Sequence, residues 1–235
     1  MSDMPEAGAV DRNERRLALF TGIVFLWLIL NGIANILFFP GIPSGTYADA
    51  AKAVTASAWQ YRLDPADLLI ETLSGVLLEF GLYVLLKRVN RELALLGLLF
   101  MAQDSCMSAI LRGLGFARVG LYASPAPTAV GALPLQNSAE FIRWISDYIE
   151  KVGGIYFGIG MLLFFCLFLR SRYLPKLLSI FGLFVFTVWI GLYFAILLRP
   201  EYRTTLQYFA FALIAVTNAA SGIFLIRFGL ARNSL

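Results

Sequence analysis

Acidic side chains at helical spacing stand out inside two of the most apolar segments of the sequence. Asp67, Glu71 and Glu79 follow one another at four and eight residues, so they would share one face of a helix. Asp104 and Arg112 lie eight residues apart in the next apolar segment and form a matching stripe. An ionisable group inside a bilayer costs at least about 2.5 kcal/mol, so each needs a partner or a water-lined cavity.

The two stripes can be aligned by counting outward from the short turn between their segments. Arg112 then falls level with Asp67, and Asp104 falls between Glu71 and Glu79, about 6 Å in height from each. We therefore expect an outer ion pair of Arg112 with Asp67 or Glu71. The inner pair would be two acids, Glu79 and Asp104. Since adjacent carboxylates repel each other when both are ionised, at least one of the two should carry a proton at neutral pH.

This predicted intramembrane polar site has two interpretations. The acids could relay protons or line a polar substrate cavity. They could equally be structural and hold helices together through hydrogen bonds. For Glu79 and Asp104 we favour function, because the middle of the bilayer is the most costly depth for a structural contact. Asn31 and Asn35, four residues apart in the first apolar segment, are interpreted as packing contacts.

The residue types that several kinds of catalysis need are missing. The chain contains no histidine, which removes imidazole acid–base chemistry and the usual metal and haem ligand sets. Cys106 and Cys166 lie in apolar runs and are interpreted as small buried hydrophobic residues. No P-loop, nucleophile elbow or dinucleotide fingerprint is present. We predict no catalytic residue, no metal and no cofactor, and we favour a protein that is not an enzyme.

The composition is typical of a membrane protein. Of 235 residues, 59% are hydrophobic and 14% are charged, whereas an average soluble domain has about 45–50% apolar and 25% charged residues. The apolar runs approach about 20 residues, the length of a helix that crosses a hydrocarbon layer of about 30 Å. The net charge of +4 is concentrated at the flanks of these runs, where anionic lipid headgroups lie. Nucleic acid is therefore not an expected partner.

The apolar runs predict an all-α, polytopic transmembrane bundle of about six helices in a single domain, 17–228, between tails 1–16 and 229–235. The predicted spans are 17–39, 66–86, 93–114, 153–169, 177–198 and 205–226. The connections at 87–92 and 170–176 are so short that the spans on either side of each must be antiparallel neighbours. The amphipathic stretch 141–149 is predicted to be an interfacial helix that lies in the headgroup layer as an anchor.

The distribution of Lys and Arg predicts the orientation. Short flanks on one side of the spans carry most of the clustered cations: Arg12, Arg15, Arg16, Lys87, Arg88, Arg91, Arg170, Arg172, Lys176, Arg227 and Arg232. The cations of the other side are spread through much longer loops. Because cytoplasmic loops are enriched in Lys and Arg close to the spans, both termini are predicted to be cytoplasmic.

Two stretches resemble landmarks of the bacterial "domain of unknown function 4386" family. They are residues 82–96 (LYVLLKRVNRELALL) and residues 169–178 (LRSRYLPKLL), the second entered from GGIYFG at 153–158. The resemblance extends from about residue 17 to 228 and implies six or so helices in a bacterial cytoplasmic membrane, with no catalytic residue. Members tend to have an arginine and an acid in the third span, where this chain has Met101 and Asp104. The acid is kept and the arginine is missing.

Two functions follow as hypotheses. In the first, the protein is a non-enzymatic membrane component that binds lipid or a partner, either another membrane protein or a second copy of itself, and its acids are structural. In the second, it is a small proton-linked transporter in which Glu79 and Asp104 exchange protons. An intramembrane enzyme is the weakest alternative, because activated water and histidine bases have no source in this sequence.

Overall fold

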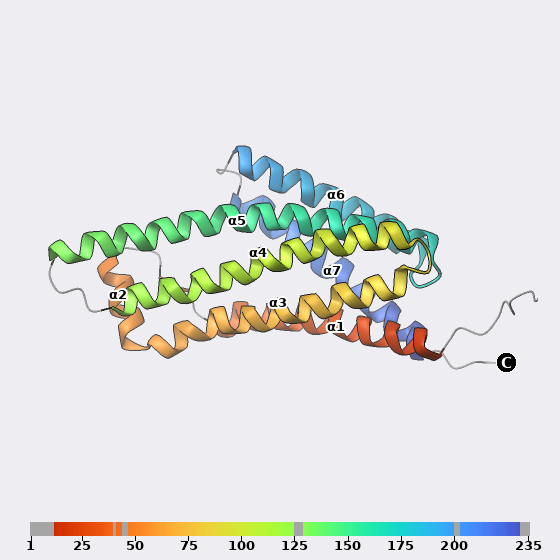
Figure 1. Ribbon diagram of the computed structural model, residues 1–235, viewed down its shortest axis with the longest axis horizontal. Coiled ribbons are helices and arrows are strands. Elements are labelled where there is room, and N and C mark those ends of the chain that lie inside the picture. The colour runs from red at the N-terminus through yellow and green to blue at the C-terminus, as the bar shows by residue number, and fades with distance from the viewer. Residues whose placement is uncertain (1–11, 40, 44–46, 125–128, 200–202, 231–235) are drawn as a thin grey trace, which may run out of the picture.

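The computed structural model describes residues 12–39, 41–43, 47–124, 129–199 and 203–230, and within these ranges it contains helices and no strands. The helices are α1 (Arg12–Phe38), α2 (Tyr47–Ala56), α3 (Ala58–Leu86), α4 (Arg91–Ala123), α5 (Ala129–Arg170), α6 (Lys176–Leu198) and α7 (Arg203–Leu230). All except α2 contain a segment long and apolar enough to cross a membrane. This confirms the predicted polytopic bundle of about six helices (Figure 1).

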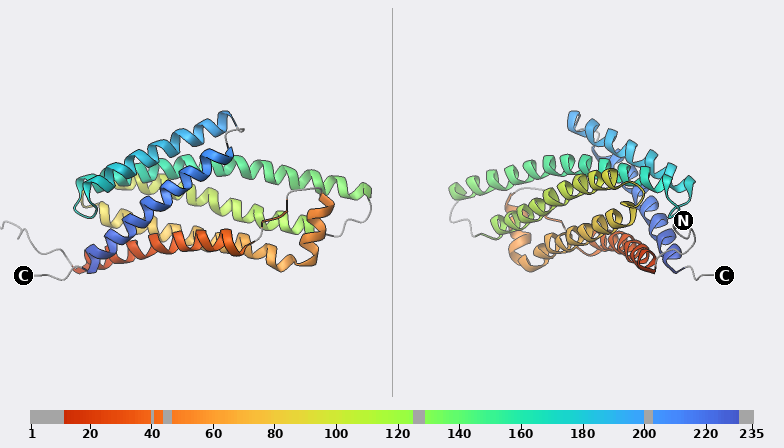
Figure 2. Two further views of the ribbon diagram at one scale, coloured as in Figure 1. Left: turned by 180° about the vertical axis from the view of Figure 1, so that it is seen from behind. Right: turned by 45° about the vertical axis from the view of Figure 1, so that its right-hand side comes forward.

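The six long helices form a closed ring. Going round it, α1 packs against α3, α3 against α4, α4 against α5, α5 against α6, α6 against α7, and α7 returns to α1. The start of α1, the end of α7 and the two tight connections lie together at one end, which we call the hairpin end (Figures 1 and 2). The short α2 packs against α3 and α4 at the opposite end.

Three helices extend beyond the predicted spans at the end opposite the hairpin end. α3 begins at Ala58, α4 continues to Ala123, and α5 occupies Ala129–Arg170. The stretch 141–149 is helical as predicted, but it is continuous with the fourth span and cannot lie as a separate helix in the headgroup layer. No glycine or proline interrupts the chain between residues 138 and 152, so nothing ends the helix before the span begins.

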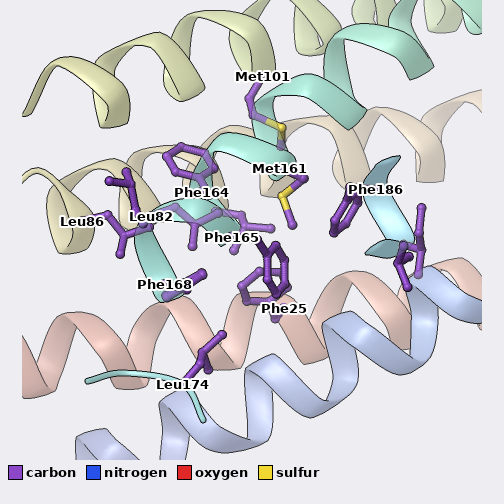
Figure 3. Packing of buried hydrophobic residues seen from close by; sticks show 14 of the residues in the cluster. Phe25, Leu82, Leu86, Met101, Met161, Phe164, Phe165, Phe168, Leu174 and Phe186 are labelled. Atoms are coloured by element: carbon purple, nitrogen blue, oxygen red, sulfur yellow. The ribbon is translucent and has the colours of Figure 1, made fainter. Parts of the chain in front are cut away.

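Large apolar side chains fill the ring from the hairpin end to its middle. Phe164, Phe165 and Phe168 of α5 are fully buried, and they meet Phe25 of α1 and Phe186 of α6 in one cluster (Figure 3). Lipid tails are as apolar as these side chains, so close packing rather than the exclusion of water stabilises the cluster. The polar residues predicted as a site lie outside it.

Glycines bring α1 and α7 into backbone contact near the hairpin end. A Cβ atom added to Gly22 would lie 2.7 Å from the carbonyl oxygen of Gly222, and one added to Gly229 would lie 2.7 Å from the carbonyl oxygen of Arg15. Small residues of this kind let membrane helices approach closely and gain van der Waals contact. The α1–α7 contact, which closes the ring, therefore depends on the absence of side chains.

We expect Gly22→Ala to destabilise the protein by about 1–3 kcal/mol, because its methyl group would meet backbone that moves only with the whole of α7. Gly32→Ala is the matched control on the same helix, since a Cβ atom there meets nothing within 4 Å. That variant should be as stable as the original or slightly more stable. Thermal unfolding in detergent measures both, and equal melting temperatures would contradict the close α1–α7 contact.

Candidate functional site

The polar residues of the predicted site lie where α1, α3, α4 and α5 meet. We call them, together with their hydrogen-bond partners on these helices, the polar seam. Its members are Asn31, Asn35, Asp67, Glu71, Thr72, Glu79, Asp104, Ser105 and Arg112. The hydrogen bonds within the seam join one helix to another, so the positions of its side chains depend on how the helices pack.

Asp67 is held by α1. Its Oδ2 accepts hydrogen bonds from Asn31 Nδ2 at 3.1 Å and from Asn35 Nδ2 at 3.0 Å. The two asparagines are four residues apart, so both amides project from one face of α1 toward the same carboxylate. Asn35 Nδ2 also donates to Asp64 Oδ1 at 3.2 Å. The interpretation of the asparagines as packing contacts agrees with this arrangement.

Glu79 and Asp104 do not bond to each other. Glu79 is only 3% exposed, and its Oε1 accepts a hydrogen bond from Ser105 Oγ at 2.5 Å. The Asp104 carboxylate faces α5, where a Cβ atom added to Gly153 would lie 2.8 Å from Oδ1. The two acids are close enough to interact electrostatically. The inner pair predicted from the sequence is therefore a pair of neighbours with separate partners.

Arg112 does not form the predicted outer ion pair with Asp67 or Glu71. Its Nε donates a long hydrogen bond, 3.5 Å, to Thr72 Oγ1. Its guanidinium interacts electrostatically with four carboxylates on three helices: Asp64, Glu71, Asp104 and Glu150. Arg112 thus interacts electrostatically with several acids and forms an ion pair with none of these four described residues.

The direction of helical side chains explains the heights at which Glu79 and Arg112 meet their hydrogen-bond partners. Gly115 lies opposite Pro65, since a Cβ atom added to the glycine would be 3.1 Å from the proline Cβ, and this register agrees with counting from the turn. Helical side chains lean toward the N-terminus of their own helix. Because α3 and α4 are antiparallel, Glu79 leans away from the hairpin end and Arg112 leans toward it. Each therefore meets a hydroxyl group that is not level with its own backbone.

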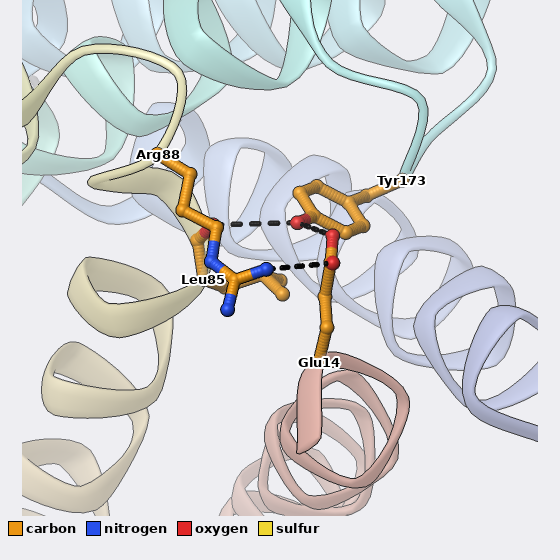
Figure 4. Close-up of polar contacts among 4 residues, drawn as sticks. All are labelled: Glu14, Leu85, Arg88 and Tyr173. Atoms are coloured by element: carbon orange, nitrogen blue, oxygen red, sulfur yellow. Dashed lines mark hydrogen bonds and ion pairs between the residues drawn. The ribbon is translucent and has the colours of Figure 1, made fainter. Parts of the chain in front are cut away.

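A second polar cluster, not predicted from the sequence, lies at the hairpin end. Glu14 of α1 accepts a hydrogen bond from the Tyr173 hydroxyl and forms an ion pair with Arg88 at 3.0 Å (Figure 4). The Tyr173 hydroxyl also lies 3.4 Å from the carbonyl oxygen of Leu85. The cluster connects the start of α1 to both tight connections. Its members are 74 and 159 residues apart, so no local sequence pattern could have indicated it.

Because of this cluster, we expect the protein to lose stability at high pH. Burial raises the pKa of the Tyr173 phenol, and the hydrogen bond to Glu14 and the Glu14 charge raise that pKa further. The tyrosine pKa in the unfolded chain is about 10. Because the pKa of Tyr173 is higher in the folded protein, the protonated phenol stabilises the fold fully below about pH 10, and this stabilisation is lost as the pH rises further. Tyr173→Phe should cost about 1 kcal/mol near neutral pH and should lose less stability than the original protein above about pH 10.

Thermal unfolding of the Tyr173→Phe variant in detergent, between about pH 8 and pH 11, tests this expectation. Tyr61→Phe, toward the opposite end of the bundle, is the control for the titration of tyrosines in general. Parallel stability curves for the original protein and Tyr173→Phe would contradict the link between this phenol and Glu14.

The cysteines and the acids add no further site. Cys106 and Cys166 are both free thiols; Cys166 is partly buried, but Cys106 is exposed on the outer face of α4, so its interpretation as a buried residue was wrong. An apolar run that crosses a bilayer has a lipid-facing side, and its average hydropathy does not show which side a residue occupies. In the described part of the chain, no three His, Cys, Asp or Glu side chains come together as a metal site.

Comparison with protein-family models identifies the chain. Residues 20–229 match the model described as "Domain of unknown function (DUF4386)", which covers most of the sequence. The chain belongs to this family. Searches of curated proteins and of solved structures gave no match. The DUF4386 region includes nearly all of the six long helices and the whole polar seam, and it confirms the resemblance found in the sequence.

One departure from the pattern expected in DUF4386 members lies beside the seam. Met101, where an arginine was expected, is 3% exposed and packs against α5, since a Cβ atom added to Gly160 would be 2.6 Å from its Cγ. An apolar side chain therefore fills this position, and the cation that interacts with Asp104 is Arg112.

Proposed function

We propose that this integral membrane protein is a non-enzymatic membrane component that binds lipid or a partner protein, and that its polar seam holds the helices together. The observation that carries the proposal is the bonding of Glu79. An acid that is 3% exposed and bonded to Ser105 of the neighbouring helix has the burial and the partner of a structural contact. Asp67, bonded to two amides of α1, has the same character.

The surface of α5 supports a binding role. Phe141, Trp144 and Tyr148 are 59%, 58% and 37% exposed. Their spacing of three and four residues places them on one helical face, and their rings follow one another with centroids 6.3 and 4.8 Å apart. Aromatic side chains are enriched both in protein interfaces and at membrane surfaces. A continuous exposed aromatic face is thus suited to a lipid surface or a partner protein.

Proton-linked transport is the second candidate. Arg112 and the four carboxylates around it favour this candidate, because they come from three helices of the ring and Arg112, Glu71 and Asp104 are only partly buried. Ionisable groups that meet between transmembrane helices commonly mark proton or substrate pathways. In this reading, Glu79 and Asp104 would exchange protons with water.

Proton uptake and release by the purified protein in lipid vesicles distinguishes the two candidates. We would compare the original protein with Glu79→Gln and Asp104→Asn between about pH 5 and pH 9. Glu140→Gln, which removes an exposed acid of α5, calibrates the signal of one carboxylate. We expect the two seam variants to titrate like the original protein. A titration step lost in either one, with folding unchanged, would replace the structural proposal with the transport proposal.

We also propose that the protein lies in a bacterial cytoplasmic membrane with its hairpin end toward the cytoplasm. Both tight connections at this end carry cations close to the spans, Lys87 and Arg88 in one and Arg170 and Arg172 in or beside the other. This is the distribution that the positive-inside rule assigns to the cytoplasmic side.

A further inference from the structure

A recess of about 310 Å³ opens between α1 and the end of α3 at the hairpin end. Leu17 of α1 and Val84 and Leu85 of α3 form its apolar wall. Lys87 and Arg88, which directly follow the last residue of α3, form its cationic rim. The recess therefore changes from apolar to cationic at the level where the transmembrane helices end.

The charges of this rim favour an anion. Glu14 is the acid that lines the recess, and its carboxylate is already engaged by Arg88 at 3.0 Å and by the Tyr173 hydroxyl (Figure 4). The ion pair compensates the Glu14 charge and holds Arg88 beside the opening. Lys87 is exposed at the same rim, so Lys87, Arg88 and Glu14 together give the recess a net charge of +1.

We propose that the recess binds the headgroup region of an anionic phospholipid. The phosphate would lie against Lys87 and Arg88, and the first acyl carbons against Leu17 and Val84. Such a lipid has the same order of polarity along its length as the recess, and cations at a membrane surface attract anionic headgroups. This inference names the lipid class for the lipid-binding function proposed above, and it rests on that function.

Lipid binding to the full-length protein in neutral detergent tests the inference. Native mass spectrometry counts bound phosphatidylglycerol, with phosphatidylcholine as the zwitterionic probe and inorganic phosphate as the free anion. We expect Lys87→Gln to weaken phosphatidylglycerol binding about fivefold, the effect of one surface cation. Lys176→Gln is the matched control, because it removes an exposed lysine of the other tight connection that lies outside the recess.

Val84→Trp tests the apolar wall without changing any charge. The indole would occupy the recess, so phosphatidylglycerol binding should fall about tenfold or more while phosphatidylcholine bound elsewhere is unaffected. Equal losses in Lys87→Gln and Lys176→Gln would overturn the site in favour of general surface attraction. Displacement of the lipid by an equal concentration of inorganic phosphate, or unchanged binding in Val84→Trp, would overturn the assignment to a phospholipid.

These variants lie apart from the polar seam, so the two proposals can fail separately. Loss of the lipid site would leave the proton titration of Glu79→Gln and Asp104→Asn unchanged. A titration that supports transport would likewise leave the measured lipid affinities as they are.

Discussion

Glu79→Ala should destabilise the bundle by about 2–4 kcal/mol, whereas Glu79→Gln should cost less than about 1 kcal/mol. Alanine leaves a cavity between α3 and α4 and removes the acceptor of the Ser105 hydroxyl, whose hydrogen bond to Glu79 Oε1 is 2.5 Å long. The glutamine carbonyl keeps that acceptor and nearly the same volume. Reversible unfolding in mixed micelles, followed by circular dichroism, measures both differences.

Two further variants separate the hydrogen bond from the packing. Ser105→Ala removes the donor alone and should cost about 0.6 kcal/mol, the average for hydrogen bonds between membrane helices, and no more than about 1.7 kcal/mol. The double variant Glu79→Leu with Ser105→Ala replaces both polar groups by apolar ones and should be close to the original stability, because no unpaired group remains. If Glu79→Ala were as stable as the original protein, the seam could not be a structural device at this position.

The number of helices long and apolar enough to cross a membrane could be predicted from the sequence, because a helix that crosses the hydrocarbon layer needs a run of about 20 apolar residues. The extensions of α3, α4 and α5 beyond the spans could not, since residues 58–65, 115–123 and 129–152 are of mixed polarity and hydropathy does not mark them. Pro65 and Pro134 lie inside helices, although proline is a common helix boundary.

The charged residues of the polar seam could also be predicted, but Thr72 and Ser105, which bond to two of them, could not. Helical period placed Asp67, Glu79 and Arg112 on facing stripes. The partners depend on the lean of each side chain and on which third helix packs alongside. The bonds from Asn31 and Asn35 to Asp67 exist because α1 packs against α3, a contact that no short connection imposes.

The apolar cluster lies beside the polar seam and extends further toward the hairpin end. Toward the hairpin end, aromatic side chains such as Phe164 and Phe168 fill the interior. Toward the opposite end, α3, α4 and α5 carry the four acids that interact electrostatically with Arg112. Since none of these four described acids forms an ion pair with Arg112, the favourable electrostatic energy is shared among all of them. Removing the cation should therefore have more effect than removing any one acid.

Arg112→Gln should destabilise the protein by about 1–2 kcal/mol, because it removes a cation that interacts electrostatically with carboxylates on three helices. Arg118→Gln is the matched control six residues further along α4. The buried Nε of Arg118 has no hydrogen-bond partner, so its replacement should change stability by less than about 1 kcal/mol. Unfolding measurements on the two variants compare a cation within the group of acids with one outside it.

The interaction of Arg112 with the acids can be isolated by adding Glu71→Gln. In the original protein this change removes one attraction to the arginine and should be mildly destabilising. In the Arg112→Gln variant the same change removes one of several mutually repelling charges and should restore stability. We expect a coupling of about 1 kcal/mol from this double-mutant cycle. Additive effects would mean that Arg112 acts through its packing against Thr72 and not through its charge.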